Sequence, residues 1–188
     1  MTGPWRLPGG ERGVALVLTL MVLVTLTGLA LALLSVSAFE PRISRNLGDA
    51  ARARYLAEAG IEVGYTTLVA AAGTDATWNA LLATATAAAP WAALSSLSAA
   101  ALPGLTAGEG TYSVSVRNDW QAGDTGITGE AADSDAALDV NGVLIMRATG
   151  LFKDATRTVE VVVKRRPTPP SPDPSIRAFC TMSNWREI

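Results

Sequence analysis

The feature that most constrains this chain is an uncharged apolar segment near its amino terminus. Residues 14–39 form a run of 26 without Asp, Glu, Lys or Arg. An α-helix rises about 1.5 Å per residue, and about 20 apolar residues span the core of a bilayer. The run therefore predicts a membrane-crossing helix, preceded by a short polar leader over residues 1–13.

A cleaved secretory signal is one alternative for this segment. Val36-Ser37-Ala38 supplies small residues of the kind that precede a signal-peptidase cut, which would release a secreted domain after Ala38. The apolar core of such signals is only about 7 to 15 residues long, so the length of the run favours retention in the membrane. A single-span envelope anchor unrelated to filaments is another alternative. Arginines flank the run on both sides and do not fix its orientation.

The residue types exclude most catalytic chemistry. The 188-residue chain contains no histidine and a single cysteine, Cys180. The usual zinc ligand sets, a serine-histidine triad and an intrachain disulfide are therefore ruled out. The formal net charge of -2 provides no broad basic field for nucleic acid. We expect a non-enzymatic protein with no cofactor and no nucleic-acid partner.

The start of the apolar run resembles a known processing junction. Glu11-Arg12-Gly13 followed by Val14-Ala15-Leu16-Val17-Leu18 is similar to the prepilin-peptidase site of type IV pilin-like proteins. Further similarity over residues 39–47 and 55–62 resembles the amino-terminal region of PilX-type minor pilins, which are related to the K-type minor pseudopilins of type II secretion. The resemblance covers roughly residues 11–68.

The resemblance implies cleavage between Gly13 and Val14 by a prepilin peptidase. It places the uncleaved chain in the bacterial inner membrane with a periplasmic domain, and the assembled subunit on a surface pilus. Major pilins typically carry glutamate at the fifth mature position, where this chain has Leu18. A carboxylate in an apolar helix is costly unless it finds a partner, so Leu18 suits a first subunit that has no predecessor.

The expected function is therefore that of a minor pilin in the tip or initiation complex of a type IV pilus, supporting pilus assembly and adhesion. A minor pseudopilin of type II secretion is the alternative. The implied partners are the prepilin peptidase, other minor pilins, the major pilin, the inner-membrane assembly platform and an adhesin. Gly28 and the hydroxyl residues near it predict helix contacts in lipid, although isolated anchors also contain such residues. Pro41 predicts a bend, because it lacks an amide hydrogen.

Apolar residues continue at helical spacing after Pro41, so residues 40–69 predict the periplasmic, amphipathic half of the same helix, with Gly73 just beyond its end. Three glycines within it, each weakening an isolated helix by about 1 kcal/mol, imply that packing supports it. The expected packing stripe consists of Ile43, Leu47, Ala50, Ala57, Ile61, Tyr65 and Leu68, and the three glycines are Gly48, Gly60 and Gly64.

Residues 70–164 predict one globular domain. Alternating or β-rich residues over 112–116, 143–149 and 157–164 predict an antiparallel sheet of at least three strands, with a turn over 150–156. The predicted fold class is α+β and pilin-like: a long amino-terminal transmembrane and amphipathic helix packed on a small antiparallel sheet. Trp78 and Trp91 are expected in the core, and a recognition role for either is the alternative. Trp78, Leu81, Leu82 and Ala85 are expected to form one face of a short helix.

An acidic connection precedes the second predicted strand. Asp133, Asp135 and Asp139 are weak candidates for binding calcium, and a solvated loop of turn-forming residues is the alternative. Residues 165–175 predict a proline-rich linker. The tail over 176–188 is expected either to dock as an edge strand or to be disordered.

Overall fold

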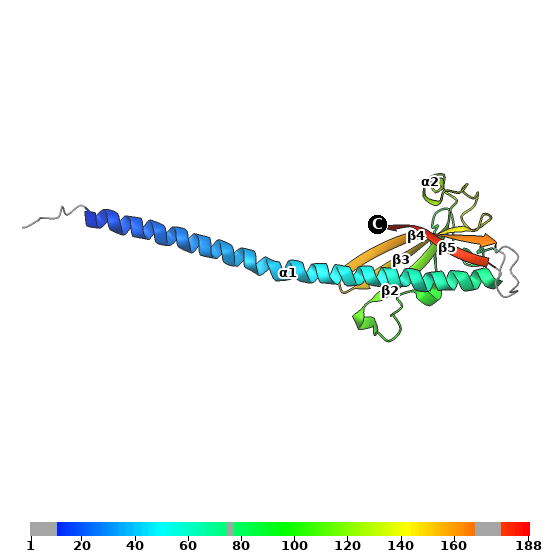
Figure 1. The fold of residues 1–188 in the computed structure, drawn as a ribbon, viewed down its shortest axis with the longest axis horizontal. Coiled ribbons are helices and arrows are strands. Elements are labelled where there is room, and N and C mark those ends of the chain that lie inside the picture. Colours follow the sequence, from blue (N-terminus) through cyan, green and yellow to red (C-terminus); the bar gives the residue numbers. More distant parts are fainter. Residues whose placement is uncertain (1–10, 75–76, 168–177) are drawn as a thin grey trace, which may run out of the picture. The chain divides into compact units, whose positions relative to one another are not determined.

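The computed structural model describes residues 11–74, 77–167 and 178–188, which form two compact units, Met1–Asn46 and Leu47–Ile188 (Figure 1). Most of the predicted leader and of the predicted linker lies outside the described residues. The elements in chain order are α1 (Glu11–Thr74), β1 (Ala92–Ala93), η1 (Ser95–Leu97), η2 (Ala107–Glu109), β2 (Thr111–Asn118), α2 (Thr125–Thr128), β3 (Val143–Phe152), β4 (Ala155–Pro167) and β5 (Ala178–Glu187).

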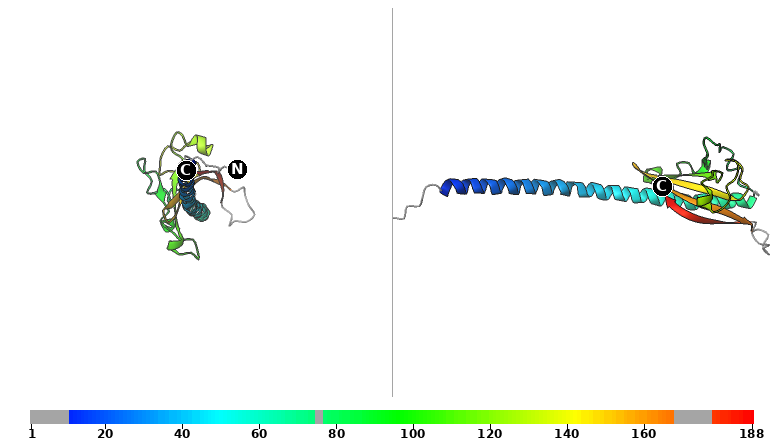
Figure 2. Two further views of the ribbon diagram at one scale, coloured as in Figure 1. Left: turned by 90° about the vertical axis from the view of Figure 1, so that its left-hand side faces the viewer. Right: turned by 90° about the horizontal axis from the view of Figure 1, so that it is seen from above.

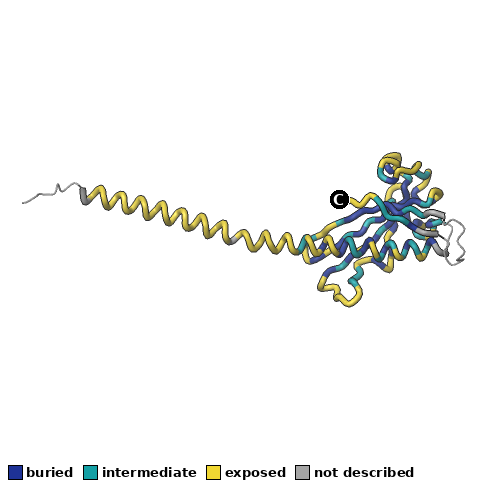
Figure 3. Tube along the Cα trace, in the orientation of Figure 1, coloured by how far each residue is buried: buried dark blue, intermediate teal, exposed yellow. Residues whose placement is uncertain are grey.

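The first unit contains the apolar half of α1. Its described side chains are exposed on every face of the helix, as the yellow stretch in Figure 3 shows. The hydroxyl groups of Thr19, Thr25, Thr27 and Ser35 bond back to the helix: Thr19 Oγ1, for example, donates to the carbonyl of Ala15 at 2.9 Å, and Thr27 Oγ1 to that of Leu23 at 2.6 Å. These four hydroxyl groups are therefore satisfied within the helix, as polar groups in lipid must be.

The second half of α1 packs on the sheet within the second unit. Ala57, Ile61 and Leu68 are buried, which confirms part of the predicted stripe. The stripe was wrong at its start, because Ile43 and Leu47 are 57% and 67% exposed. Packing begins instead with Ala53 and Leu56, which form a small cluster with Phe152 from the end of β3. The periodicity predicts a helical face, but only the position of the sheet decides where its burial begins.

The predicted α+β fold is confirmed: the second half of α1 lies along an antiparallel sheet (Figure 2). The sheet has five strands in the order β1-β2-β3-β4-β5. The turn predicted over 150–156 is shorter, because β3 runs to Phe152 and β4 begins at Ala155. Gly150 belongs to the strand, where a Cβ would lie 2.0 Å from the carbonyl oxygen of Ala53. Glycine at this position permits a close approach of α1 that the sequence pattern did not reveal.

The carboxyl-terminal tail forms an edge strand, one of the two outcomes expected from its sequence. β5 pairs with β4, with an irregularity in register between Glu160 and Val162. Tyr65 of α1 donates its hydroxyl hydrogen to the carbonyl of Cys180, and Cys180 itself is buried in the main core. Backbone pairing and a contact to the helix thus hold β5 on the domain.

The segment after α1 differs from its prediction. Gly73 lies inside α1, which ends at Thr74, and Trp78 lies in a series of turns instead of a helix. Trp78 is nevertheless buried, as predicted, and its Nε1 donates to the carbonyl of Leu68 at 3.2 Å. A buried indole needs such an acceptor, so the tryptophan joins this segment to α1.

Candidate assembly and processing site

The predicted processing pair lies in the first turns of α1, which begins at Glu11. Val14 is 60% exposed, and a Cβ added to Gly13 would meet no atom within 4 Å. No described residue therefore packs over the bond between Gly13 and Val14. Cleavage there stays a prediction.

The predicted assembly residues are also uncovered. Leu18 is 57% exposed, and nothing lies within 4 Å of a Cβ added at Gly28. α1 is long and apolar enough, by length and composition, to cross a membrane, and the described side chains of its most apolar window are not buried. A helix that is apolar on all faces is unfavourable in water and requires lipid or other helices around it. Pro41 lies inside α1, and a bend at this position stays a prediction.

The calcium candidates lie in the connection between β2 and β3, but their carboxylates are not brought together as a ligand set. Each accepts hydrogens from nearby backbone amides. The pairs are Asp133 Oδ2 with Val140 at 3.0 Å, Asp135 Oδ1 with Ala137 at 2.7 Å, and Asp139 with Trp78 at 3.1 Å and Gly142 at 2.7 Å. Within the described residues, no three His, Cys, Asp or Glu side chains are placed to hold a metal ion.

Other carboxylates of this connection are buried. Asp124 accepts two hydrogen bonds from the guanidinium of Arg117, at 2.6 and 2.7 Å. Asp119 is fully buried and accepts from the Asn141 amide at 3.0 and 3.2 Å. Burial raises the pKa of Asp119 to about 6, and the hydrogen bond from Asn141 opposes that rise. The connection is therefore a folded, hydrogen-bonded structure and not only a solvated loop.

A second charged cluster lies on the sheet. Glu160 of β4 is 2% exposed and accepts hydrogen bonds from Arg147 of β3, at 2.6 and 2.8 Å, and from Arg186 of β5. The Arg147 guanidinium also stacks 3.9 Å from the ring centre of Trp91, which is only half-buried. Trp91, which was expected in the core, packs against the small buried cluster of Val143, Ile145 and Val162 and also covers Arg147. The charged cluster links the edge strand β5 to its neighbour β4 and, beyond it, to β3.

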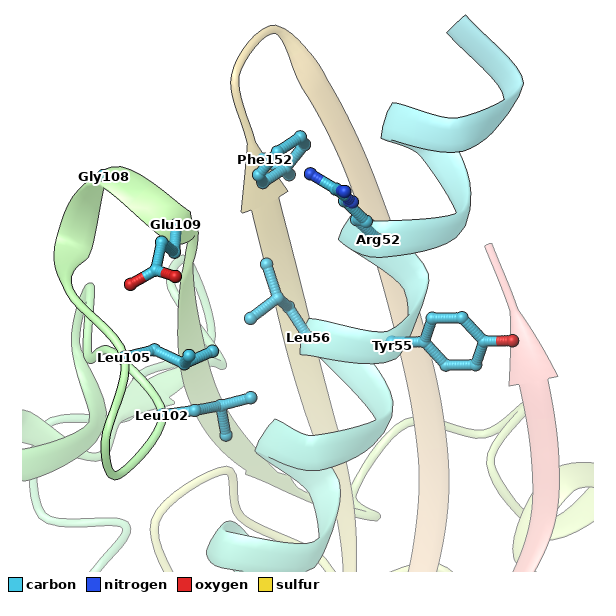
Figure 4. Close-up of a pocket in the computed structure, with 8 residues that line it drawn as sticks. All are labelled: Arg52, Tyr55, Leu56, Leu102, Leu105, Gly108, Glu109 and Phe152. Carbon is cyan, nitrogen blue, oxygen red and sulfur yellow. The ribbon is translucent and has the colours of Figure 1, made fainter. Parts of the chain in front are cut away.

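A groove of about 460 Å³ lies beside α1, between the helix and the segment that precedes β2 (Figure 4). Leu56 and Phe152 point into it, and the guanidinium of Arg52 lies 4.9 Å from the centre of the Phe152 ring. Across the groove, hydrogen bonds from the backbone and hydroxyl of Thr106 lower the pKa of Glu109. The groove combines an apolar floor with one cation and one anion at its rim.

Comparison with known families finds a match that covers most of the helical segment. The PilX N-terminal family model matches residues 12–62. The match supports a PilX-type minor pilin of the type IV pilus, a family that is generally non-enzymatic. Comparisons with curated proteins and with solved structures give no match.

Two structural residues were not predicted from the sequence. Glu160 lies within a valine-rich strand. With the hairpin turn placed at residues 153–154, the sequence puts Glu160 opposite Arg147 on the neighbouring strand, so this ion pair could have been predicted. Asn118, the last residue of β2, is fully buried and had no local signal. Its role depends on how the acidic connection folds over the end of the sheet.

Proposed function

We propose that the chain is a minor pilin that acts in the tip or initiation complex of a type IV pilus. The observation that carries the proposal is the apolar half of α1, which is exposed on all sides and continuous in sequence with the domain that bears the sheet. Such a helix can anchor the uncleaved subunit in the inner membrane and later pack among other pilin helices. The PilX N-terminal match supports this class of function.

The proposed position in the complex rests on Leu18. An apolar residue at the fifth mature position cannot pair with the terminal amine of a preceding subunit, so this subunit would stand first. Cleavage between Gly13 and Val14 would precede its extraction from the membrane by the assembly platform. The periplasmic domain would then contact other minor pilins, the major pilin or an adhesin.

Deletion of the gene tests the proposed role in the filament. We expect fewer surface filaments and weaker adhesion, both restored by the wild-type gene. Unchanged filament number and adhesion would contradict a minor pilin role. Loss of protein secretion with normal filaments would instead identify a type II secretion pseudopilin.

Complementation with Leu18→Glu tests the first position, with Leu18→Ile as the matched control. In a first subunit, the introduced carboxylate has no partner in lipid, so the glutamate variant should restore filaments poorly and the isoleucine variant fully. Full restoration by both variants would overturn the proposed first position but leave the minor pilin role intact.

A further inference from the structure

Asp119 directly follows β2 and begins the acidic connection between β2 and β3, residues 119–142. It is fully buried, and the side-chain amide of Asn141, near the end of the connection, donates to both of its carboxylate oxygens, at 3.0 and 3.2 Å. The same amide donates to the carbonyl of Ala131 at 2.9 Å, and the backbone amide of Asp133 donates to the carbonyl of Asp119 at 3.1 Å. Asp119 therefore ties the start of the connection to its middle and its end.

The charges that face Asp119 are negative, because they belong to the carboxylates of Asp133 and Asp124. The connection contains no lysine or arginine, and the basic side chains of the adjoining strands have other partners. The pairs are Arg117 with Asp124, Lys164 with Glu130, and Arg165 with the carbonyl of Ala72. Among the residues that the structure describes, none forms a salt bridge with Asp119. A buried carboxylate without a cation is unfavourable, so this site favours the protonated carboxyl.

The protonation of Asp119 is coupled to folding in a definite direction. Burial raises the pKa of Asp119 to about 6, whereas an aspartate in an unfolded chain has a pKa of about 3.9. Between these two values the folded domain holds a proton that the unfolded chain has released, so protonation stabilises the folded form. This stabilisation is complete below about pH 4 and is lost as the pH rises through about 6.

We propose that Asp119 is a pH-operated latch on the acidic connection, closed when its carboxyl is protonated in mildly acidic surroundings and weakened when the carboxyl ionises at neutral pH. The proton removes both the cost of burying a charge and the repulsion from Asp124 and Asp133. The carbonyl oxygen of the protonated group still accepts from the Asn141 amide, so the tie to the end of the connection is kept. Ionisation leaves an uncompensated charge at the same place, which strains this tie.

The latch controls a segment that exposes two apolar side chains. Leu138 and Val140 of the connection are 46% and 72% exposed. The backbone amide of Val140 donates to Asp133 Oδ2 at 3.0 Å, and Asp133 is in turn bonded through its backbone to Asp119. A weakened latch therefore loosens the segment that holds this apolar pair. The latch would act in the folded domain whether or not the chain enters a pilus.

Hydrogen exchange of the full chain in detergent, from about pH 5 to about pH 7.5 and corrected for the intrinsic exchange rate, tests the latch. Peptides covering residues 119–142 should lose protection as the pH rises, with a midpoint at about 6. Asp119→Asn, which is neutral throughout, should keep high protection at every pH. Asp154→Asn is the matched control, because Asp154 is exposed in the turn between β3 and β4 and its loss should leave the wild-type midpoint in place. Constant protection in the wild-type chain, or the wild-type midpoint in Asp119→Asn, would overturn the proposal.

Asn141→Ala keeps the test decisive if Asp119→Asn fails to fold. The Asn141 amide favours the ionised form of Asp119, so its removal should move the midpoint for loss of protection to higher pH. If Asn141 only holds the connection in place, the variant would lose protection equally at every pH, and an unchanged midpoint would contradict the latch.

Discussion

Single glycines determine how closely α1 approaches the sheet. A Cβ at Gly64 would lie 2.7 Å from Met146 Sδ and 2.9 Å from Val114 Cγ1, and a Cβ at Gly150 would lie 2.0 Å from the Ala53 carbonyl oxygen. These contacts involve strands and a helix that are far apart in sequence. Packing therefore offsets the helix-weakening effect of Gly64, as its position in the predicted amphipathic helix implied.

Gly150→Ala should destabilise the domain by about 3 kcal/mol, because the new methyl group meets backbone that cannot move aside. Gly48→Ala is the control within α1: a Cβ there meets nothing within 4 Å, so the change should stabilise the helix by about 1 kcal/mol. Denaturant unfolding of both variants measures these effects. Equal stability of the two variants would show that α1 does not approach β3 this closely.

Glu160→Ala should destabilise the domain by about 3 kcal/mol, since it removes a buried carboxylate that two arginines share. Glu58→Ala serves as the comparison, because Glu58 pairs with Arg54 at the helix surface, where removal should leave stability nearly unchanged. Calorimetric unfolding of both variants tests the difference. A Glu160→Ala chain as stable as the wild-type chain would contradict a role for the cluster in holding β5.

At the scale of elements, periodicity was the reliable guide. The three strongest strand patterns became β2, β3 and β4, and the apolar run became part of α1. The lengths of the turns and the residue at which α1 begins to pack on the sheet were less predictable. Both depend on the contact between Gly150 and Ala53, which are far apart in the sequence. The two-residue β1 and the fold of the acidic connection depend on tertiary contacts that alternation does not encode.

Tyr65→Phe tests how β5 is held. The hydroxyl of Tyr65 bridges α1 to the carbonyl of Cys180, so its removal should lower stability by about 1 kcal/mol and increase hydrogen exchange in β5. Tyr55 lies on the same helix but is 69% exposed, so Tyr55→Phe should change neither quantity. Equal protection of β5 in both variants would argue against the bridge.

At the scale of the whole molecule, two kinds of surface occur in one chain. The first unit exposes apolar side chains that require lipid or neighbouring helices, while the second encloses one main hydrophobic core and two smaller buried clusters. A chain with an exposed apolar helix and an independent core is suited to exist first in a membrane and later in a filament. The PilX N-terminal match over residues 12–62 agrees with this arrangement.

The amino-terminal sequence of the protein from cells with and without an active prepilin peptidase tests this account most directly. We expect a start at Val14 only where the peptidase is active, because Gly13 and Val14 form the junction between the polar leader and the apolar run. A start at Met1 in both strains would indicate an uncleaved anchor, and a start at Phe39 would indicate a secreted domain. Either result would contradict assignment of the chain to processed minor pilins.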